Sequence, residues 1–434
     1  MKFGYSENAV HAHMYASGID ALIVESKDLE EALAVGTGPI SIDDADFESS
    51  QFELWRIIKL RALKRIERIH RSIKHGKFIG SKIKLPIDGT RAMELDLLGQ
   101  HDDGIFILEL KVDDSSERNA FSELLGYSQY IAQMFAMSGP GDITNVLVAP
   151  MHVKITRQAF LYDLLVANRD VVVYKPVLVD GTLASLQLQL YVPPDEEFRF
   201  FANQLLSHDA MSCTVVSFPD LKGWYDSTDV YVNEHTRKFL SGLSGYASQL
   251  MEAEQLHGFS YIRQYWPELP FPYKNALIIC AINPFVFVNE DRAEALVRQL
   301  DEESSLSLLE QPRHAFLGRV IRLAERAIRD SLSHGQRYEI GVPQWSAMVR
   351  SIVETATCTN FGFRPTGLFR EAFVTYINRL HQERSDGAPH DVSRVKIEDV
   401  SSWMRAWIFM EVCGFDGTNS SDIEDDLDDD PEES

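Results

Sequence analysis

Apolar residues recur every three to four positions in the segment 52–73, and this spacing predicts one long amphipathic helix. The predicted apolar stripe consists of Phe52, Trp55, Ile58, Ala62, Ile66, Ile69 and Ile73. Gly76 and Gly80 follow the last of these residues and mark the end of the helix.

After this helix the pattern changes to short segments typical of strands. The strands are expected at 82–87, 92–99, 104–111, 144–149 and 171–178, with helices at about 117–137 and 156–167. The order α-β-β-β-α-β-α-β predicts an α/β layer with a mixed sheet, which is antiparallel at first and parallel after the crossover helix.

From about Pro193 onward, helical patterns dominate the sequence. Helices are expected at 195–206, 232–256, 291–301, 312–334, 365–383 and 396–412. We therefore expect four regions: an N-terminal extension (1–45), an α/β domain (46–192), a mostly α-helical C-terminal domain (193–414) and a disordered acidic tail (415–434).

Composition and cysteine usage are those of an ordinary globular protein. Apolar residues make up 45% and charged residues 25% of the 434 residues, and the four cysteines form no CxxC spacing. No signal peptide and no membrane-spanning stretch is recognisable, and P-loop, HExxH and nucleophile-elbow motifs are absent. These features predict a cytoplasmic protein with no membrane partner and no nucleotide cofactor.

Charge is distributed very unevenly along the chain. The formal net charge is −23, and residues 416–434 hold ten acidic residues and no basic one. Residues 55–84, in contrast, hold eleven Lys and Arg and one acid, Glu67. This basic segment predicts contact with nucleic acid, and the alternative is a solvated helix face. The proposed contact residues are Arg56, Lys59, Lys64, Arg65, Arg68, Arg71 and Lys74.

Charged residues also interrupt two segments that otherwise have the pattern of buried strands. If 101–104 forms a hairpin loop, residues whose numbers sum to 205 are paired, which places Asp96 opposite Glu109 and Glu94 opposite Lys111. Two opposed carboxylates need a cation, and Mg²⁺ (or Mn²⁺) has the matching preference for oxygen ligands. Lys111 adds a positive charge nearby, and this combination of groups suits phosphodiester hydrolysis.

The run "ELDLLGQHDDGIFILELK" resembles the core of the PD-(D/E)XK nuclease superfamily, in particular its RecB-type and mismatch-nuclease branches, over about residues 46–180. The family carries an acid on its second strand and (D/E)-x-K on its third, within an αβββαβ restriction-endonuclease-like core. The resemblance implies that Asp96, Glu109 and the Leu110 carbonyl hold the metal and that Lys111 positions the hydrolytic water.

Further positions match the family less closely. Glu53 corresponds best to the acid that the family often carries on its first helix, with Glu48 as the alternative, and Glu94 matches an extra acid of some branches. These branches also have a Gln-x-x-x-Tyr signature on the next helix. Here Glu123 stands in place of the Gln, and Tyr127 follows.

The function implied by this resemblance is Mg²⁺-dependent DNA endonuclease activity, in restriction, phage defence or repair. Two alternatives stay open: a catalytically inactive nuclease-like protein that binds nucleic acid or acts as a scaffold, and a nuclease that cleaves RNA. The C-terminal domain is expected to select the substrate, to form a homodimer or to bind a partner protein.

Overall fold

The computed structural model describes residues 3–35, 54–85, 93–135, 142–205, 210–220, 234–266, 268–286, 290–332, 337–348 and 357–374. The chain divides into two compact units, one formed by residues 1–38 with 58–201 and the other by residues 39–57 with 202–434. Glu53, Glu48 and the acidic tail lie outside the described residues.

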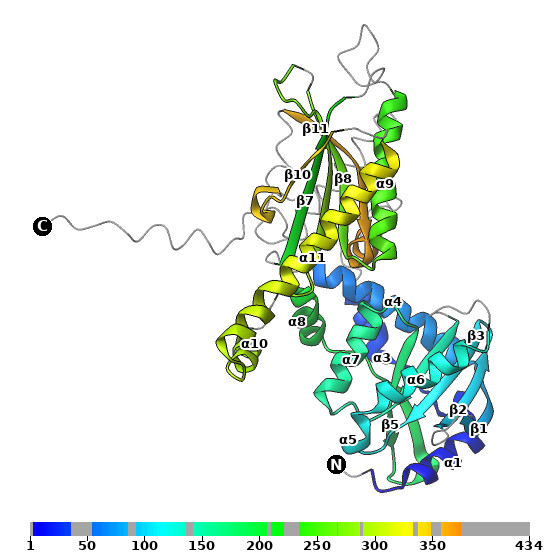
Figure 1. Ribbon diagram of the computed structural model, residues 1–434. Coiled ribbons are helices and arrows are strands. Elements are labelled where there is room, and N and C mark those ends of the chain that lie inside the picture. The colour runs from blue at the N-terminus through cyan, green and yellow to red at the C-terminus, as the bar shows by residue number, and fades with distance from the viewer. Residues whose placement is uncertain are drawn as a thin grey trace, which may run out of the picture. The chain divides into compact units, whose positions relative to one another are not determined.

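The first unit is built around a six-stranded mixed sheet (Figure 1). Its strands lie in the order β1 (Lys77–Leu85), β2 (Met93–His101), β3 (Gly104–Leu110), β4 (Ile143–Val148), β5 (Val171–Leu178) and β6 (Leu186–Leu190). The pairs β1–β2, β2–β3 and β5–β6 are antiparallel, whereas β3–β4 and β4–β5 are parallel. The predicted change from antiparallel to parallel pairing after β3 is confirmed, and β6 is a strand that the pattern did not predict.

Helices accompany this sheet along the sequence. They are α1 (Glu7–Ser17), α2 (Ile19–Leu22), α3 (Lys27–Val35), α4 (Leu54–Lys74), α5 (Asp114–Glu117), α6 (Ala120–Ala132), α7 (Lys154–Leu165) and α8 (Asp195–Leu205), with a short 3₁₀ turn at Leu183–Ser185. The apolar stripe predicted for α4 is confirmed in its described part, where Ile58, Ala62, Ile66, Ile69 and Ile73 are buried. The periodicity of α4 therefore reflects packing onto the core.

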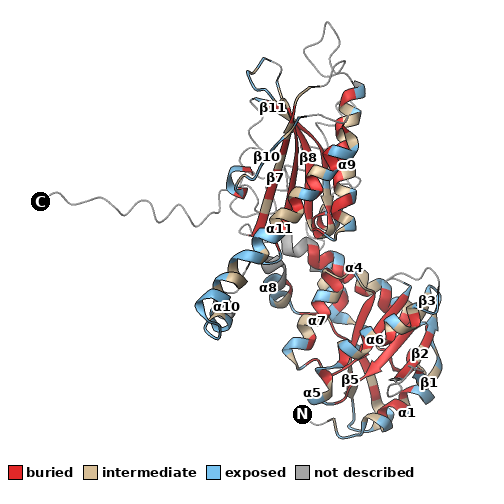
Figure 2. Cartoon of the chain, viewed as in Figure 1, coloured by how far each residue is buried: buried red, intermediate tan, exposed pale blue. Residues whose placement is uncertain are grey.

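The central strands β3 and β4 are covered on both faces, and their sequences are correspondingly apolar. All six residues of β4 and the last five of β3 are buried, as Figure 2 shows by its red strands. Strands buried on two faces require near-continuous apolar runs. Gly99 on β2 leaves room for the ring of Phe106 on β3, because a Cβ atom at residue 99 would lie only 2.0 Å from that ring.

The hairpin between β2 and β3 has the predicted register. Leu97 pairs with Leu108, and the pairing continues in the same register to His101 and Gly104. The turn itself is Asp102–Asp103, one residue tighter at each end than the four-residue loop that we assumed. This register brings the middle of β2 alongside the end of β3, where the charged residues lie.

The second unit contains a five-stranded antiparallel sheet in addition to helices, and the expectation of a mostly helical C-terminal domain did not include this sheet (Figure 1). The strand order is β10 (Glu339–Gly341), β7 (Met211–Phe218), β9 (Asn275–Ile282), β8 (Gly258–Tyr265) and β11 (Cys358–Thr366). Helices in the described part of this unit include α9 (Glu234–Ala253), α10 (Glu290–Val297) and α11 (Glu302–Ser331), and residues 367–374 are also helical. Helices α9 and α11 share one apolar core with the sheet.

Buried polar residues explain why β8 was not recognised as a strand. Ser260 and Arg263 interrupt the apolar pattern of β8, yet both are buried. The Ser260 hydroxyl donates to the backbone oxygen of Ser244, and the Arg263 Nε donates to the Asn360 side-chain oxygen at 3.2 Å. Their polarity is satisfied by contacts between elements that are distant in sequence, and such contacts leave no periodic signal.

Two predictions about the whole chain can be compared with its described part. No helix there is long and apolar enough to cross a membrane. The cysteines Cys213, Cys280 and Cys358 are free thiols and buried, while Cys413 lies outside the described residues.

Candidate active site

Three of the predicted site residues meet where β2 runs beside the end of β3. Asp96 and Glu109 lie on these two strands, and Lys111 directly follows β3; all three are buried. The Asp96 Oδ2 accepts a hydrogen bond from the backbone N–H of Leu110 at 3.0 Å. The Lys111 Nζ lies 2.6 Å from the Glu109 Oε1. The two strands thus bring two carboxylates and one ammonium group together.

Glu109 is the least satisfied of these groups. Burial and the neighbouring Asp96 raise the pKa of Glu109 to about 9, and the attraction of Lys111 only partly opposes them. Its Oε2 is buried and has no hydrogen-bond partner among the described residues. A buried carboxylate oxygen without a partner is costly and therefore marks a place where a ligand could bind.

Lys111 is held between two carboxylates. Besides Glu109, the Glu123 Oε2 on α6 lies 2.5 Å from its Nζ. Burial by itself would lower the pKa of Lys111, but the two carboxylates outweigh burial and raise this pKa above its ordinary value. The lysine therefore stays protonated at neutral pH.

Helix α6 supplies the two supporting residues that the sequence predicted. Glu123 occupies the position where the family signature has Gln, and it contacts Lys111 directly. Tyr127 is buried one turn further along. Burial, followed by the charges of Glu109 and Glu123, raises the pKa of Tyr127 to about 12. Both residues thus belong to the electrostatic surroundings of the site.

A second lysine at the site was not predicted. The Lys82 Nζ lies 2.7 Å from the Asp96 Oδ1, and Lys82 has a φ of 49°, in the left-handed region that few residues other than glycine adopt. Glu94 is half-exposed and lies 3.9 Å from the same Nζ. The β2–β3 register extends only from Leu97 and Leu108 to the turn, so the expected pairing of Glu94 with Lys111 lies beyond it, and on its other side Glu94 pairs with Lys84 of β1.

Helix α1 adds two further residues that the sequence reasoning missed. The backbone oxygen of Asp96 lies 2.9 Å from the Nε2 of His11, which is buried. Burial raises the pKa of Glu7, and this carboxylate also feels the charges of Lys111 and Asp96. An acid from an N-terminal helix therefore lies within electrostatic range of the site. No local motif marks it, and only the Ser6 cap signals that a helix begins there.

The cations of α4 are mostly engaged within the protein. Arg65 and Arg68 both bind Asp170, Lys59 pairs with Asp195, Lys74 pairs with Glu25, and Arg71 pairs with Glu67. Lys64 is exposed, and the side chain of Arg56 lies outside what the structure describes. The sequence-local excess of positive charge is thus largely offset by acids from other elements.

The fit of a divalent metal can be judged from the donors at the site. Among the described residues, no group of three or more His, Cys, Asp or Glu side chains is arranged to hold a metal ion. Mg²⁺ commonly uses one or two protein carboxylates and completes its coordination with water and substrate phosphates. Asp96 and Glu109 supply two carboxylates, and the buried Glu109 Oε2 lacks a partner, so the donor set fits this cation.

The chain matches no protein-family model, no curated protein and no solved structure.

Proposed function

We propose that the chain is a Mg²⁺-dependent (or Mn²⁺-dependent) nuclease that hydrolyses DNA phosphodiester bonds. The observation that carries the proposal is the convergence of Asp96, Glu109 and Lys111 at one buried place, with one Glu109 oxygen lacking a partner. The same three residues carry the resemblance to PD-(D/E)XK nucleases, so motif and geometry point to one site.

In this proposal, Asp96, Glu109 and the backbone carbonyl of Leu110 hold the metal. When bound, Mg²⁺ supplies a Lewis acid for the phosphoryl oxygens and lowers the pKa of a coordinated water. The N–H of Leu110 donates to the Asp96 Oδ2 at 3.0 Å and fixes this carboxylate against the end of β3. Positioning of this kind lowers the entropic part of the barrier.

Lys111 then orients the attacking water and offsets the negative charge that develops on the phosphate. A protonated ammonium group donates hydrogen bonds and cannot accept a proton, so its raised pKa argues for this role over that of a general base. Glu123 lies 2.5 Å from the Lys111 Nζ and holds the side chain in place. Glu123 is therefore a positioning residue.

A second candidate function rests on Lys82. Its ammonium lies 2.7 Å from the Asp96 Oδ1, on the carboxylate that the metal requires. A cation fixed there would satisfy Asp96 without a metal, as in a nuclease-like fold that binds nucleic acid without cutting it. An RNA-cleaving enzyme would use the same groups, and parallel cleavage of labelled DNA and RNA separates these substrates.

A plasmid-nicking assay with Mg²⁺ tests the proposal. We expect Asp96→Asn and Lys111→Ala each to reduce cleavage by about 10²- to 10⁴-fold, because each removes charge stabilisation in the transition state. The control is Asp102→Asn, which neutralises an exposed acid at the far end of the same hairpin and should cleave like wild type. Wild-type protein that leaves the plasmid intact, or variants that match it, would refute a catalytic site here.

A further inference from the structure

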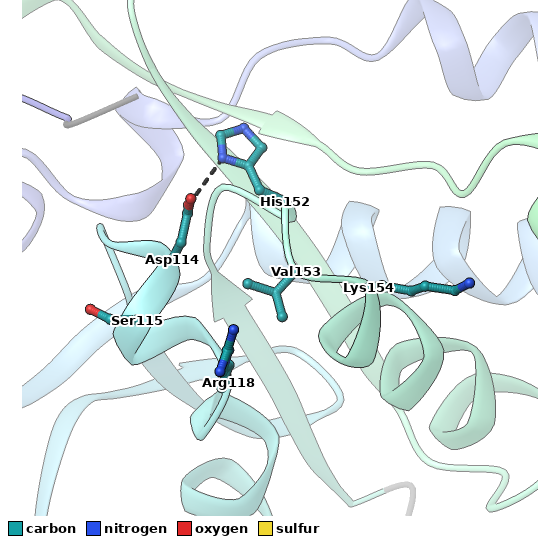
Figure 3. A pocket seen from close by; sticks show the side chains of 6 residues that line it. All are labelled: Asp114, Ser115, Arg118, His152, Val153 and Lys154. Atoms are coloured by element: carbon teal, nitrogen blue, oxygen red, sulfur yellow. Dashed lines mark hydrogen bonds and ion pairs between the residues drawn. The ribbon is translucent and has the colours of Figure 1, made fainter. Parts of the chain in front are cut away.

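A hollow of about 580 Å³ lies at the edge of the first sheet where β3 and β4 end (Figure 3). Its lining residues are Asp114, Ser115, Arg118, His152, Val153 and Lys154. The N–H of Lys111 donates to the Val148 oxygen at 2.8 Å, so the segments that leave the two strands start side by side. The hollow therefore begins three residues beyond Lys111 in the chain.

The acidic groups around the hollow already have partners. The Asp114 Oδ1 lies 3.1 Å from the Nδ1 of His152, an interaction drawn as the dashed line in Figure 3. Glu117 is fully buried and accepts hydrogen bonds from the N–H groups of Val153 at 2.9 Å and His152 at 3.3 Å. These bonds tie the segment that leads into α7 to the buried Glu117 carboxylate.

The two cations of the hollow are, in contrast, unused. Arg118 and Lys154 are both exposed, and neither forms an ion pair with any carboxylate in the described part of the chain. Figure 3 shows Arg118 coming from the segment after α5, close to Val153, and Lys154 coming from the start of α7, with its ammonium directed away from Arg118. Two exposed cations line one hollow and are unpaired in the described part of the chain, so each can bind an anionic group.

We propose that this hollow binds a backbone phosphate of the nucleic acid, next to the phosphate that is cleaved. Arg and Lys are the side chains that bind phosphate most strongly, Arg through two parallel hydrogen bonds and Lys as a point charge. The lining begins at Asp114, and three residues span at most about 11 Å, so the hollow begins within reach of a substrate strand that passes Lys111.

This inference rests on the proposed nuclease function and deepens it. The hollow sets the path of the substrate strand: the strand passes Lys111 and continues between Arg118 and Lys154. The contacts are to the backbone, so they carry no base preference. The hollow thus contributes affinity and register, whereas the Asp96–Glu109–Lys111 group performs the chemistry.

The test measures how tightly the full chain binds a fluorescent DNA oligonucleotide. Fluorescence anisotropy monitors the binding in EDTA at several salt concentrations. The variants are Arg118→Gln and Lys154→Gln. The matched control is Lys77→Gln, which removes an exposed charge at the other end of the same sheet. We expect Arg118→Gln and Lys154→Gln each to weaken binding by about five- to tenfold and to lower the slope of log K against log salt by about 0.7–0.9, and Lys77→Gln to change neither.

Competition with inorganic phosphate separates the two possible sources of the anion. A nucleic-acid site requires the oligonucleotide to bind at least about a hundredfold more tightly than inorganic phosphate, because several backbone contacts add to the affinity. Three results would overturn the inference. The first is an equal loss of DNA affinity in all three variants, and the second is an affinity for inorganic phosphate comparable to that for the oligonucleotide. The third is a lack of DNA binding by wild-type protein. Cleavage by wild-type protein with no effect of Arg118→Gln would overturn the hollow alone, whereas Arg118-dependent binding without any cleavage would overturn the nuclease proposal alone.

Discussion

Two buried carboxylates of the first unit, Asp170 and Glu109, are treated very differently by their surroundings. Asp170 receives Arg65 and Arg68 from α4, and each of its side-chain oxygens lies 2.8 or 2.9 Å from a guanidinium nitrogen. Glu109 has one ammonium partner and one oxygen without a partner, and burial, together with the nearby Asp96 carboxylate, raises its pKa to about 9. Both are acids with cationic neighbours, yet only one of them is fully satisfied.

The difference indicates which of the two groups is built for stability. A buried carboxylate whose oxygens are all bound to cations holds elements together, here α4 and the segment that leads into β5. A buried carboxylate that keeps an empty acceptor beside a like charge is unfavourable unless something else binds. Charge alone therefore does not identify a functional residue, and incomplete satisfaction is the more informative sign.

The largest expected effect is the loss of folding stability when Asp170, the fully satisfied carboxylate, is replaced. Asp170→Ala should lower the free energy of unfolding by about 3–5 kcal/mol, because it leaves Arg65, whose side chain is 18% exposed, without its carboxylate partner and with only the Asn168 oxygens as acceptors. Urea denaturation monitored by circular dichroism measures this change. The matched control is Glu67→Ala, which breaks the exposed pair with Arg71 and should cost at most about 0.5 kcal/mol. Equal effects of the two variants would contradict the assignment of Asp170 as a structural anchor.

Because burial disfavours the ionised form of Glu109, the stability of the protein should depend on pH. Its folded-state pKa of about 9 lies above the ordinary value of 4.5, so the folded protein holds a proton that the unfolded chain has released. Metal-free wild-type protein should therefore lose stability as the pH rises from about 4.5 through 9. The loss should exceed that of Glu109→Gln by about 1–3 kcal/mol, since the amide carries no charge to desolvate.

Urea titrations at pH 5 and pH 8.5 in EDTA measure this loss for wild type and for Glu109→Gln. Repeating the wild-type series with Mg²⁺ sharpens the comparison, because a bound divalent cation favours the ionised carboxylate and should reduce the loss at pH 8.5. Superimposable profiles for wild type and Glu109→Gln would show that Glu109 is as well satisfied as Asp170.

The sequence allowed the positions of Asp96 and Glu109 to be predicted but gave no indication that Lys82 and Glu7 lie near Asp96. The β2–β3 hairpin is a local structure, so a short turn fixes its register and brings Asp96 close to Glu109. Lys82 reaches Asp96 with a left-handed backbone on β1, whose pairing with β2 shifts register between Phe78 and Gly80. Local irregularities of this kind leave no periodic signal in a sequence.

The same limit explains the remaining differences. Glu7 approaches the site from a helix almost ninety residues before Asp96, and only tertiary packing brings them together. In the second unit, β8 was missed because Ser260 and Arg263 are polar residues that the fold buries and satisfies. In α4 the basic pattern was read correctly as a feature of the sequence, but the acids that pair with it come from distant segments.

A third prediction concerns Lys82, which gives Asp96 a cationic partner that Glu109 Oε2 lacks. Lys82→Asn should raise the affinity for Mg²⁺ by about three- to tenfold, because it removes a positive charge 2.7 Å from the Asp96 Oδ1 that opposes a second cation. Asn also tolerates the left-handed backbone that residue 82 adopts on β1, so the backbone geometry of the strand is kept. Isothermal titration calorimetry with Mg²⁺ measures the change.

Lys84→Asn serves as the control for this prediction, since Lys84 is an exposed lysine on the same strand. It should leave the Mg²⁺ affinity within about twofold of wild type, because an exposed charge is well screened. If Lys82→Asn binds Mg²⁺ no more tightly than wild type, Lys82 does not compete for Asp96. If it gains cleavage activity that wild type lacks, the lysine is what keeps the fold inactive.

The smallest effect is expected on DNA affinity when a lysine of α4 is replaced, although the sequence predicted that this helix contacts nucleic acid. Lys64 is exposed, and no described carboxylate pairs with it, whereas Lys59, Arg65, Arg68 and Lys74 are held by acids of the protein. Lys64→Gln should therefore weaken DNA binding by less than about twofold, well below the effect of removing Arg118. The anisotropy titrations described for the hollow measure both. A loss of slope of about 0.9 for Lys64→Gln would instead mean that α4 contacts a phosphate and that its ion pairs open when nucleic acid binds.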